Sequence, residues 1–196
     1  MSIKTIINRI NESIEMKEKI LKDTHLIEQI DTISQKLIGV YRSNKKVILF
    51  GNGGSAADAQ HLAAELMNKF YFDRNSLPAI ALTVNTSILT AVGNDYSFKK
   101  IFSKQLEGIG NEEDAAIGIS TSGNSINVIE GLKYAKRNKL YTIAFTGKNG
   151  GGINHIVDEC IKVPSDDTPR IQEGHIMIGH IICEIIEKEL FKKNER

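Results

Sequence analysis

The feature that most constrains this chain is a series of short apolar segments separated by stretches with helical spacing. The segments cover residues 47–50, 79–82, 115–119, 141–145 and 160–163. Apolar strands that alternate with helices are typical of a parallel sheet whose two faces are both covered. We therefore predict an α/β fold, a three-layer α/β/α sandwich with about five parallel strands and right-handed crossovers.

Helical spacing also marks both ends of the chain. Apolar residues recur with this spacing from Ile3 to Val40, so residues 1–42 should form one or two amphipathic helices. We expect this segment to be integral to a single domain of residues 1–196. A long last helix is expected from about Arg170 to Lys192. Its apolar residues cover more than one face, which favours burial against a partner subunit over burial within its own chain.

Composition excludes some functions. The formal net charge is +1, which does not suggest a nucleic-acid-binding surface. We find no apolar run long enough to span a membrane and no signal peptide, so we expect a cytoplasmic protein. Cys160 and Cys183 lack metal-binding spacing, and we expect them to be reduced and buried.

A glycine-rich turn, Gly51-Asn52-Gly53-Gly54-Ser55, follows the first predicted strand and precedes a helix. Glycines let a ligand approach the backbone, and the free N–H groups of a helix start favour anions. An ordinary tight turn with Ser55 as the helix N-cap is an equally good interpretation.

A second turn, after the third predicted strand, carries more hydroxyls than a helix cap requires. Around Gly123 and Asn124 it places Ser120, Thr121, Ser122 and Ser125. Capping uses one hydroxyl, whereas four hydroxyls beside a helix start suit a phosphate group. We favour phosphate binding over capping here.

Two pairs of polar residues lie on otherwise apolar helices. His61 and Glu65 are four residues apart and share a helix face, where they form either a surface pair or part of a metal site. Gln172 and His180 are eight residues apart, which is about 12 Å along a helix. They either reach one ligand from both ends or serve different copies of the site. The second choice predicts a site between subunits, in which Glu65 of one subunit meets the last helix of its neighbour.

Taken in order, these motifs resemble those of the sugar isomerase (SIS) domain family, and within it the phosphoheptose isomerases. The similarity covers essentially the whole chain, including the N-terminal helical segment. The similar segments are Gly51–Ser55 with Asp58, His61 and Glu65, then 77–82, 94–96, 118–125, 146–147, and 170–173 with His180.

The resemblance implies the interconversion of sedoheptulose 7-phosphate and D-glycero-D-manno-heptose 7-phosphate, for lipopolysaccharide or capsule. It implies a homotetramer with sites between subunits, Glu65 as the base and His180 as its acid/base partner. Zinc, where present, would be bound by His61, Glu65, Gln172 and His180. The substrate-lining residues implied are Asn52, Gly53, Gly54, Ser55, Glu65, Asn94, Asp95, Ser120, Thr121, Ser122, Ser125 and Gln172.

Two alternatives stay open beside the isomerase. One is a non-catalytic SIS tetramer that binds a replication-initiation protein or senses sugar phosphates. The other is a different sugar-phosphate isomerase or lyase on the same fold. The joint presence of Glu65, Gln172 and His180 favours an enzyme. Lys69 stands where the family is expected to have arginine, which keeps the charge but loses the bidentate geometry.

Overall fold

The computed structural model describes residues 2–191, and within them it contains one five-stranded parallel sheet. The strand order is β2-β1-β3-β4-β5, so the predicted fold class is confirmed. The strands are β1 (Val47–Gly51), β2 (Ala79–Ala81), β3 (Ala115–Ile119), β4 (Tyr141–Gly147) and β5 (Glu159–Val163).

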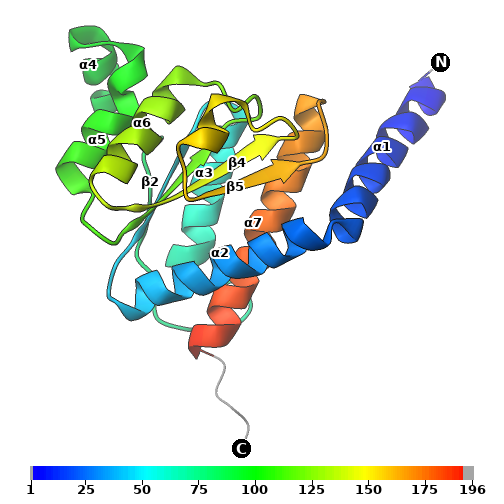
Figure 1. The fold of residues 1–196 in the computed structure, drawn as a ribbon, viewed down its shortest axis with the longest axis horizontal. Helices are drawn as coiled ribbons and strands as arrows, with labels where there is room; N and C mark the ends of the chain where they lie inside the picture. Colours follow the sequence, from blue (N-terminus) through cyan, green and yellow to red (C-terminus); the bar gives the residue numbers. More distant parts are fainter. Residues whose placement is uncertain (1, 192–196) are drawn as a thin grey trace, which may run out of the picture.

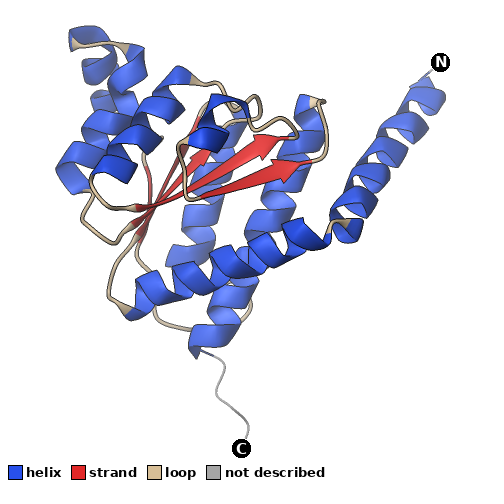
Figure 2. Ribbon diagram, in the orientation of Figure 1, coloured by secondary structure: helices blue, strands red, loops and turns tan. Residues whose placement is uncertain are grey.

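Helices cover both faces of this sheet (Figures 1 and 2). One face packs on α2 (Thr24–Arg42), α3 (Gly54–Met67) and α7 (Thr168–Phe191), and the other on α5 (Ile101–Ile109) and α6 (Ile126–Arg137). The remaining elements are α1 (Ser2–Lys22), α4 (Thr86–Asp95), and the 3-10 helices η1 (Phe98–Lys100) and η2 (Gly151–His155). Successive strand residues alternate between the two layers: Leu49 joins the first core, whereas Ile48 and Phe50 join the second.

The last helix begins near the expected residue, and its expected end at Lys192 lies outside the described residues. Most of its apolar side chains, such as Ile171, Ile178 and Ile186, are buried within this same chain. The reason is that α7 is packed between α2, α3, α1 and the sheet. Covering these side chains therefore does not require a second subunit.

The uncovered apolar surface lies instead on α1. In Figure 1 this helix projects away from the sheet, and only Met16 and Ile20 of its residues are buried. Five isoleucines of this helix are exposed, namely Ile3, Ile6, Ile7, Ile10 and Ile14. A row of exposed isoleucines at helical spacing is typical of a contact surface for another protein chain.

The two other general predictions concern thiols and membranes. Cys160 and Cys183 are both free and buried, as predicted. None of the helices in the described part of the chain is long and apolar enough to cross a membrane.

Candidate active site

The sheet topology defines a site at the carboxyl ends of β1 and β3. These strands are neighbours, but the chain continues from β1 to β2 on one side and from β3 to β4 and β5 on the other. Ligands of open α/β sheets bind where the strand order reverses in this way. Both glycine- and serine-rich turns predicted from the sequence follow these two strands, so they lie at the same edge of the sheet.

The two helices that directly follow β1 and β3 lack side-chain caps. Within the described residues, α2 and α4 are capped by the side chains of Asp23 and Asn85, whereas α3 and α6 receive no side-chain cap. Both helix dipoles favour negative charge at these starts, although the N–H groups of Ser55, Ala56 and Val128 already donate to Asn52 O, Gly53 O and Asn127 Oδ1. The capping role considered for Ser55 is wrong, because Gly53, with φ of 55°, occupies the N-cap position of α3.

A pair of amides joins the two turns. Asn52 and Asn127 exchange two side-chain hydrogen bonds, at 2.9 and 2.8 Å. Asn127 is 4% exposed and also accepts a hydrogen bond from the backbone N–H of Val128. Asn127 was not among the residues predicted from the sequence. The sequence signal for it is an amide residue whose position shares a helix face with Val128, Gly131 and Ala135, which α6 buries in the core.

The serine-rich turn is held closely by the loop after β4. Gly123 has φ of 65°, and a side chain there would collide with the backbone of Gly150. Asn124 Oδ1 accepts a hydrogen bond from Gly152 N at 2.9 Å. At the start of α6, Ser120 Oγ donates to Ser125 Oγ at 2.9 Å. The Ser125 hydroxyl is therefore paired with another hydroxyl and does not cap the helix.

A small cavity lies beside this turn. It has a volume of about 220 Å³, and its lining includes Thr121, Ser122, Gly147 and Lys148. Ser122 is exposed, and its Oγ accepts a hydrogen bond from Asn124 N at 3.1 Å. Hydroxyl groups of the turn thus border this space, while Lys148 is ion-paired with Asp166, which also lines it.

Three titratable side chains meet between α3 and α7. His61 Nε2 lies 2.7 Å from His180 Nε2 and 3.3 Å from Glu65 Oε1. One ligand atom from each of the three residues falls within 4.8 Å of the others, which makes the group a possible metal site. Two imidazoles and a carboxylate are also a set of ligands that zinc accepts.

The three residues meet within one chain because α3 and α7 run parallel and close together. Gln172 contacts Gly54 at the start of α3, and eight residues later His180 contacts His61. A Cβ at Gly179 would lie 2.6 Å from Leu62 Cδ2, so this glycine permits the close approach. Glu65 and His180 therefore meet within one chain, and a contribution of a neighbouring subunit to the site stays a prediction. Gln172, the fourth expected metal ligand, lies about two turns away from the other three.

Comparison with known proteins identifies the family of this chain. The family model of the SIS domain matches residues 10–147. The chain belongs to the SIS domain family. It is 60% identical over 183 residues to the phosphoheptose isomerase of Clostridium acetobutylicum, a match that covers 93% of each chain.

Solved structures give the same result for the fold. The phosphoheptose isomerase of Neisseria gonorrhoeae superposes with a TM-score of 0.90 at 40% identity, covering 96% of this chain and 100% of that one. The phosphoheptose isomerase of Francisella tularensis gives a TM-score of 0.92 at 36% identity, covering 96% and 99%. The resemblance seen in the sequence motifs is thereby confirmed.

One further acid of this SIS domain faces the three-residue group. Asp58 precedes His61 by one turn of α3, and its Oδ2 atom is buried without a hydrogen-bond partner among the described residues. Burial raises the pKa of Asp58, and the neighbouring His61 opposes part of that rise. Asp58 thus adds a second carboxyl group beside His61.

Three other predicted residues lie apart from the group. Asn94 and Asp95 are exposed in the last turn of α4, and Asn94 Nδ2 donates to Asp95 Oδ1 at 2.9 Å. That helix packs against η1 and α5, in the opposite layer from α7 (Figure 1). Lys69 is exposed just beyond the end of α3. Within the described chain, no hydrogen bond joins these three residues to either turn.

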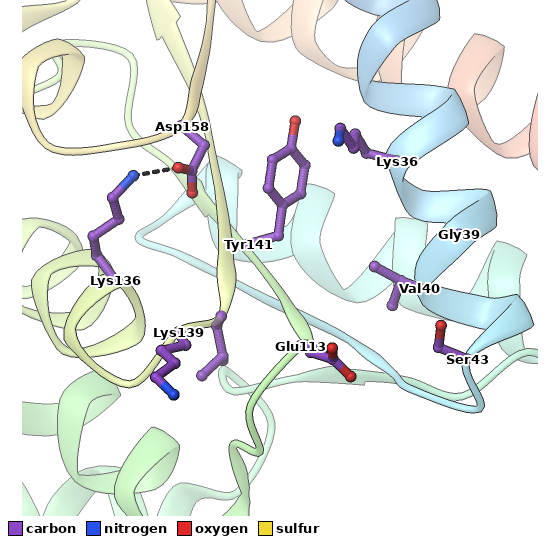
Figure 3. A pocket seen from close by; sticks show the side chains of 10 residues that line it. Lys36, Gly39, Val40, Ser43, Glu113, Lys136, Lys139, Tyr141 and Asp158 are labelled. Carbon is purple, nitrogen blue, oxygen red and sulfur yellow. Dashed lines mark hydrogen bonds and ion pairs between the residues drawn. The ribbon is translucent and has the colours of Figure 1, made fainter.

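A larger cavity of about 570 Å³ lies at the other end of the sheet (Figure 3). Its lining includes Lys36, Tyr141 and Asp158, and Tyr141 is the first residue of β4. Asp158 is paired with Lys136, another lining residue. None of the residues predicted for the site lines this cavity.

Proposed function

We propose that this SIS domain is a phosphoheptose isomerase, an aldose–ketose isomerase that interconverts sedoheptulose 7-phosphate and D-glycero-D-manno-heptose 7-phosphate. The observation that carries the proposal is the meeting of His61, Glu65 and His180 in a single chain, on α3 and α7, where the start of α3, like that of α6, has no side-chain cap. The proton-transferring groups and the anion-binding groups are thus supplied together. The 60% identical relative is named for the same activity.

The dimensions of the site suit a phosphorylated sugar. Gly54 and His61 are seven residues apart on α3, which is roughly 10 Å along the helix axis. We infer that the phosphate binds at the serine-rich turn and the start of α6, through Ser120, Thr121, Ser122 and Ser125. The sugar chain then extends along α3, past Asn52–Ser55 and Gln172, to place its first two carbons at Glu65.

The isomerisation needs one proton moved between neighbouring carbons and another between their oxygens. From the ketose, the Glu65 carboxylate takes a proton from C1 while His180 gives one to the oxygen on C2, which forms an enediol. Glu65 then returns a proton to C2, and His180 takes the proton from the oxygen on C1, which leaves the aldose. One base and one acid/base partner suffice for both steps.

Zinc fits the donor set of His61, Glu65 and His180, since two histidines and one glutamate bind this metal in other enzymes. When bound, zinc would polarise the sugar carbonyl as a Lewis acid. Glu65 bound tightly to a metal is a weaker base, so its two roles compete. Gln172 lies about two turns away on α7, against Gly54, so within one chain it does not join this donor set.

The chain is proposed to act as one SIS domain within a homotetramer in the cytoplasm, with sites close to subunit boundaries. The exposed isoleucines of α1 support assembly with further copies. We infer that Asn94 and Asp95, which are exposed on α4, line a substrate site together with another subunit. The product would supply heptose for lipopolysaccharide or capsule.

The alternative of a non-catalytic SIS protein predicts no conversion of the substrate. The test is incubation of the purified chain with sedoheptulose 7-phosphate, with and without added zinc, followed by NMR of the sugar carbons. We expect the signals of the aldose 7-phosphate to appear and to reach an equilibrium mixture. Tight binding of the sugar phosphate without conversion would support the non-catalytic alternative.

Substitution of the phosphate-site hydroxyls should act mainly on KM. Ser122→Ala and Ser125→Ala remove groups from a phosphate that does not react, so ground state and transition state lose similar binding energy. A hydrogen bond to a charged group contributes about 1.5–3 kcal/mol, which corresponds to a rise in KM of about 10- to 100-fold. Steady-state kinetics measure this rise, with Ser76→Ala, at an exposed serine before β2, as control. A large fall in kcat at unchanged KM would contradict phosphate binding here.

A further inference from the structure

A buried ion pair connects α7 with the segment that follows α3. Arg74 Nε donates to Glu187 Oε1 at 2.9 Å, and the two side chains are 2% and 1% exposed. Arg74 lies between α3 and β2, whereas Glu187 lies two turns beyond His180 on α7. A charge pair this deeply buried is costly to form, so its other hydrogen bonds indicate what it holds in place.

Glu187 holds the backbone directly after α3. Its carboxylate accepts hydrogen bonds from the N–H groups of Phe70 at 2.7 Å, Tyr71 at 2.6 Å and Phe72 at 3.3 Å. Burial by itself would raise the pKa of Glu187, but these N–H groups and Arg74 outweigh it and lower the pKa. The carboxylate is therefore ionised at neutral pH, and its known hydrogen bonds all fix the segment of residues 70–74.

Arg74 holds the end of α3 itself. Its Nη2 donates to the carbonyl oxygen of Glu65 at 2.9 Å, and its Nη1 donates to that of Leu66 at 2.8 Å. Carbonyl groups in the last turn of a helix lack partners within the helix, and a positive charge is favourable there. The guanidinium thus bonds directly to the backbone of the residue proposed as the catalytic base.

The same segment also contacts the second proposed catalytic residue. The Phe70 ring lies with its centroid 5.7 Å from that of the His180 ring. Phe70 is held through its backbone N–H by Glu187, which is on the same helix as His180. A closed set of contacts therefore runs from His180 to Phe70, to Glu187, to Arg74 and to the backbone of Glu65.

We propose that Arg74 and Glu187 are positioning residues for the isomerase reaction, which fix the Glu65 backbone and seat Phe70 against His180. This inference rests on the proposed function of Glu65 and His180. Neither residue of the ion pair is assigned a contact with substrate. Loss of the pair should therefore lower kcat more than it raises KM, because the reacting groups are misplaced while the phosphate site is intact.

The test uses Arg74→Lys and Glu187→Gln, which keep much of the volume but lose the forked geometry or the charge. The matched controls are Arg42→Lys and Glu189→Gln, because Arg42 and Glu189 form an exposed ion pair, at 3.2 Å, that also ends on α7. We expect kcat to fall about tenfold or more in the first two variants, since a misplacement of about 1 Å can cost about 10²-fold. KM should stay within about threefold, and the controls should match the parent. Urea unfolding defines conditions in which every variant is folded.

If loss of the buried ion pair prevents folding, Phe70→Leu provides a variant that leaves the pair in place. It removes the ring beside His180, and we expect a fall in kcat in the same direction. Unchanged kcat in folded Arg74→Lys, Glu187→Gln and Phe70→Leu would overturn the proposal. So would a rise in KM alone.

A readout without substrate separates this inference from the proposed function. In protein labelled with ¹³C-histidine, the NMR signals of the His180 ring should shift in Arg74→Lys and Glu187→Gln, because the Phe70 ring moves. The same signals should not shift in the two controls. If the parent chain converts no sugar phosphate, the proposed function fails, but these shifts still report whether the pair positions His180. Unshifted His180 signals in folded variants would overturn the positioning role.

Discussion

Glu65→Gln is expected to lower kcat by about 10²- to 10⁴-fold, which is the usual cost of losing a catalytic base. The amide keeps the shape of the side chain and can still form hydrogen bonds, but it cannot accept the proton from carbon. Binding of sedoheptulose 7-phosphate should change little, and isothermal titration of the variant measures it. Steady-state kinetics give kcat.

The control for this substitution is Glu107→Gln, which makes the same chemical change at an exposed carboxylate on α5. Because Glu65 is also a candidate zinc ligand, the metal content of each preparation is measured in parallel. Turnover by folded Glu65→Gln within a fewfold of the parent would rule out Glu65 as the base.

His180→Ala is expected to cost a similar factor, about 10²- to 10⁴-fold in kcat, because proton transfer at the sugar oxygens loses its partner. The loss also removes one of the three groups that meet at His61. His155→Ala, at an exposed histidine of η2, should leave kcat unchanged. A fall in activity for His180→Ala that came only through KM would contradict an acid/base role.

The parallel packing of α3 and α7 adds a sharper test of this pair. Subunits carrying Glu65→Gln and subunits carrying His180→Ala are mixed, unfolded and reassembled. Since Glu65 and His180 meet within one chain, no mixed assembly contains an intact pair, and activity should equal that of each variant reassembled alone. If the pair instead formed between subunits, about a quarter of the sites in an equal mixture would be intact, and activity would recover clearly.

The fold could be predicted from the sequence because its evidence is local. A segment such as residues 47–50, apolar throughout, indicates a strand covered on both faces wherever it occurs. The glycine-rich and serine-rich turns could be located for the same reason, since each directly follows such a strand. The role of Ser55 as a cap could not be judged, because capping depends on which residue has the N-cap backbone conformation, and in α3 that residue is Gly53.

The arrangement of the site depends on contacts far apart in the sequence, which local patterns do not report. Gln172 and His180 lie about 12 Å apart along their helix, which suggested two copies of the site. The structure shows instead that α3 runs parallel to α7, so that each of these residues faces a different turn of α3. Asn127, Arg74 and Glu187 were missed likewise, because their partners are 75 and 113 residues away.

The most direct test of Glu65 as the base of an isomerase is the conversion of sedoheptulose 7-phosphate in D₂O. The parent chain should form D-glycero-D-manno-heptose 7-phosphate with deuterium at C2, because the proton on Glu65 exchanges with solvent before it returns to carbon. Glu65→Gln should give neither product nor deuterium at C1 of the recovered ketose. Conversion without any deuterium in product or substrate would contradict proton transfer through Glu65, and no conversion by the folded parent chain would contradict the isomerase itself.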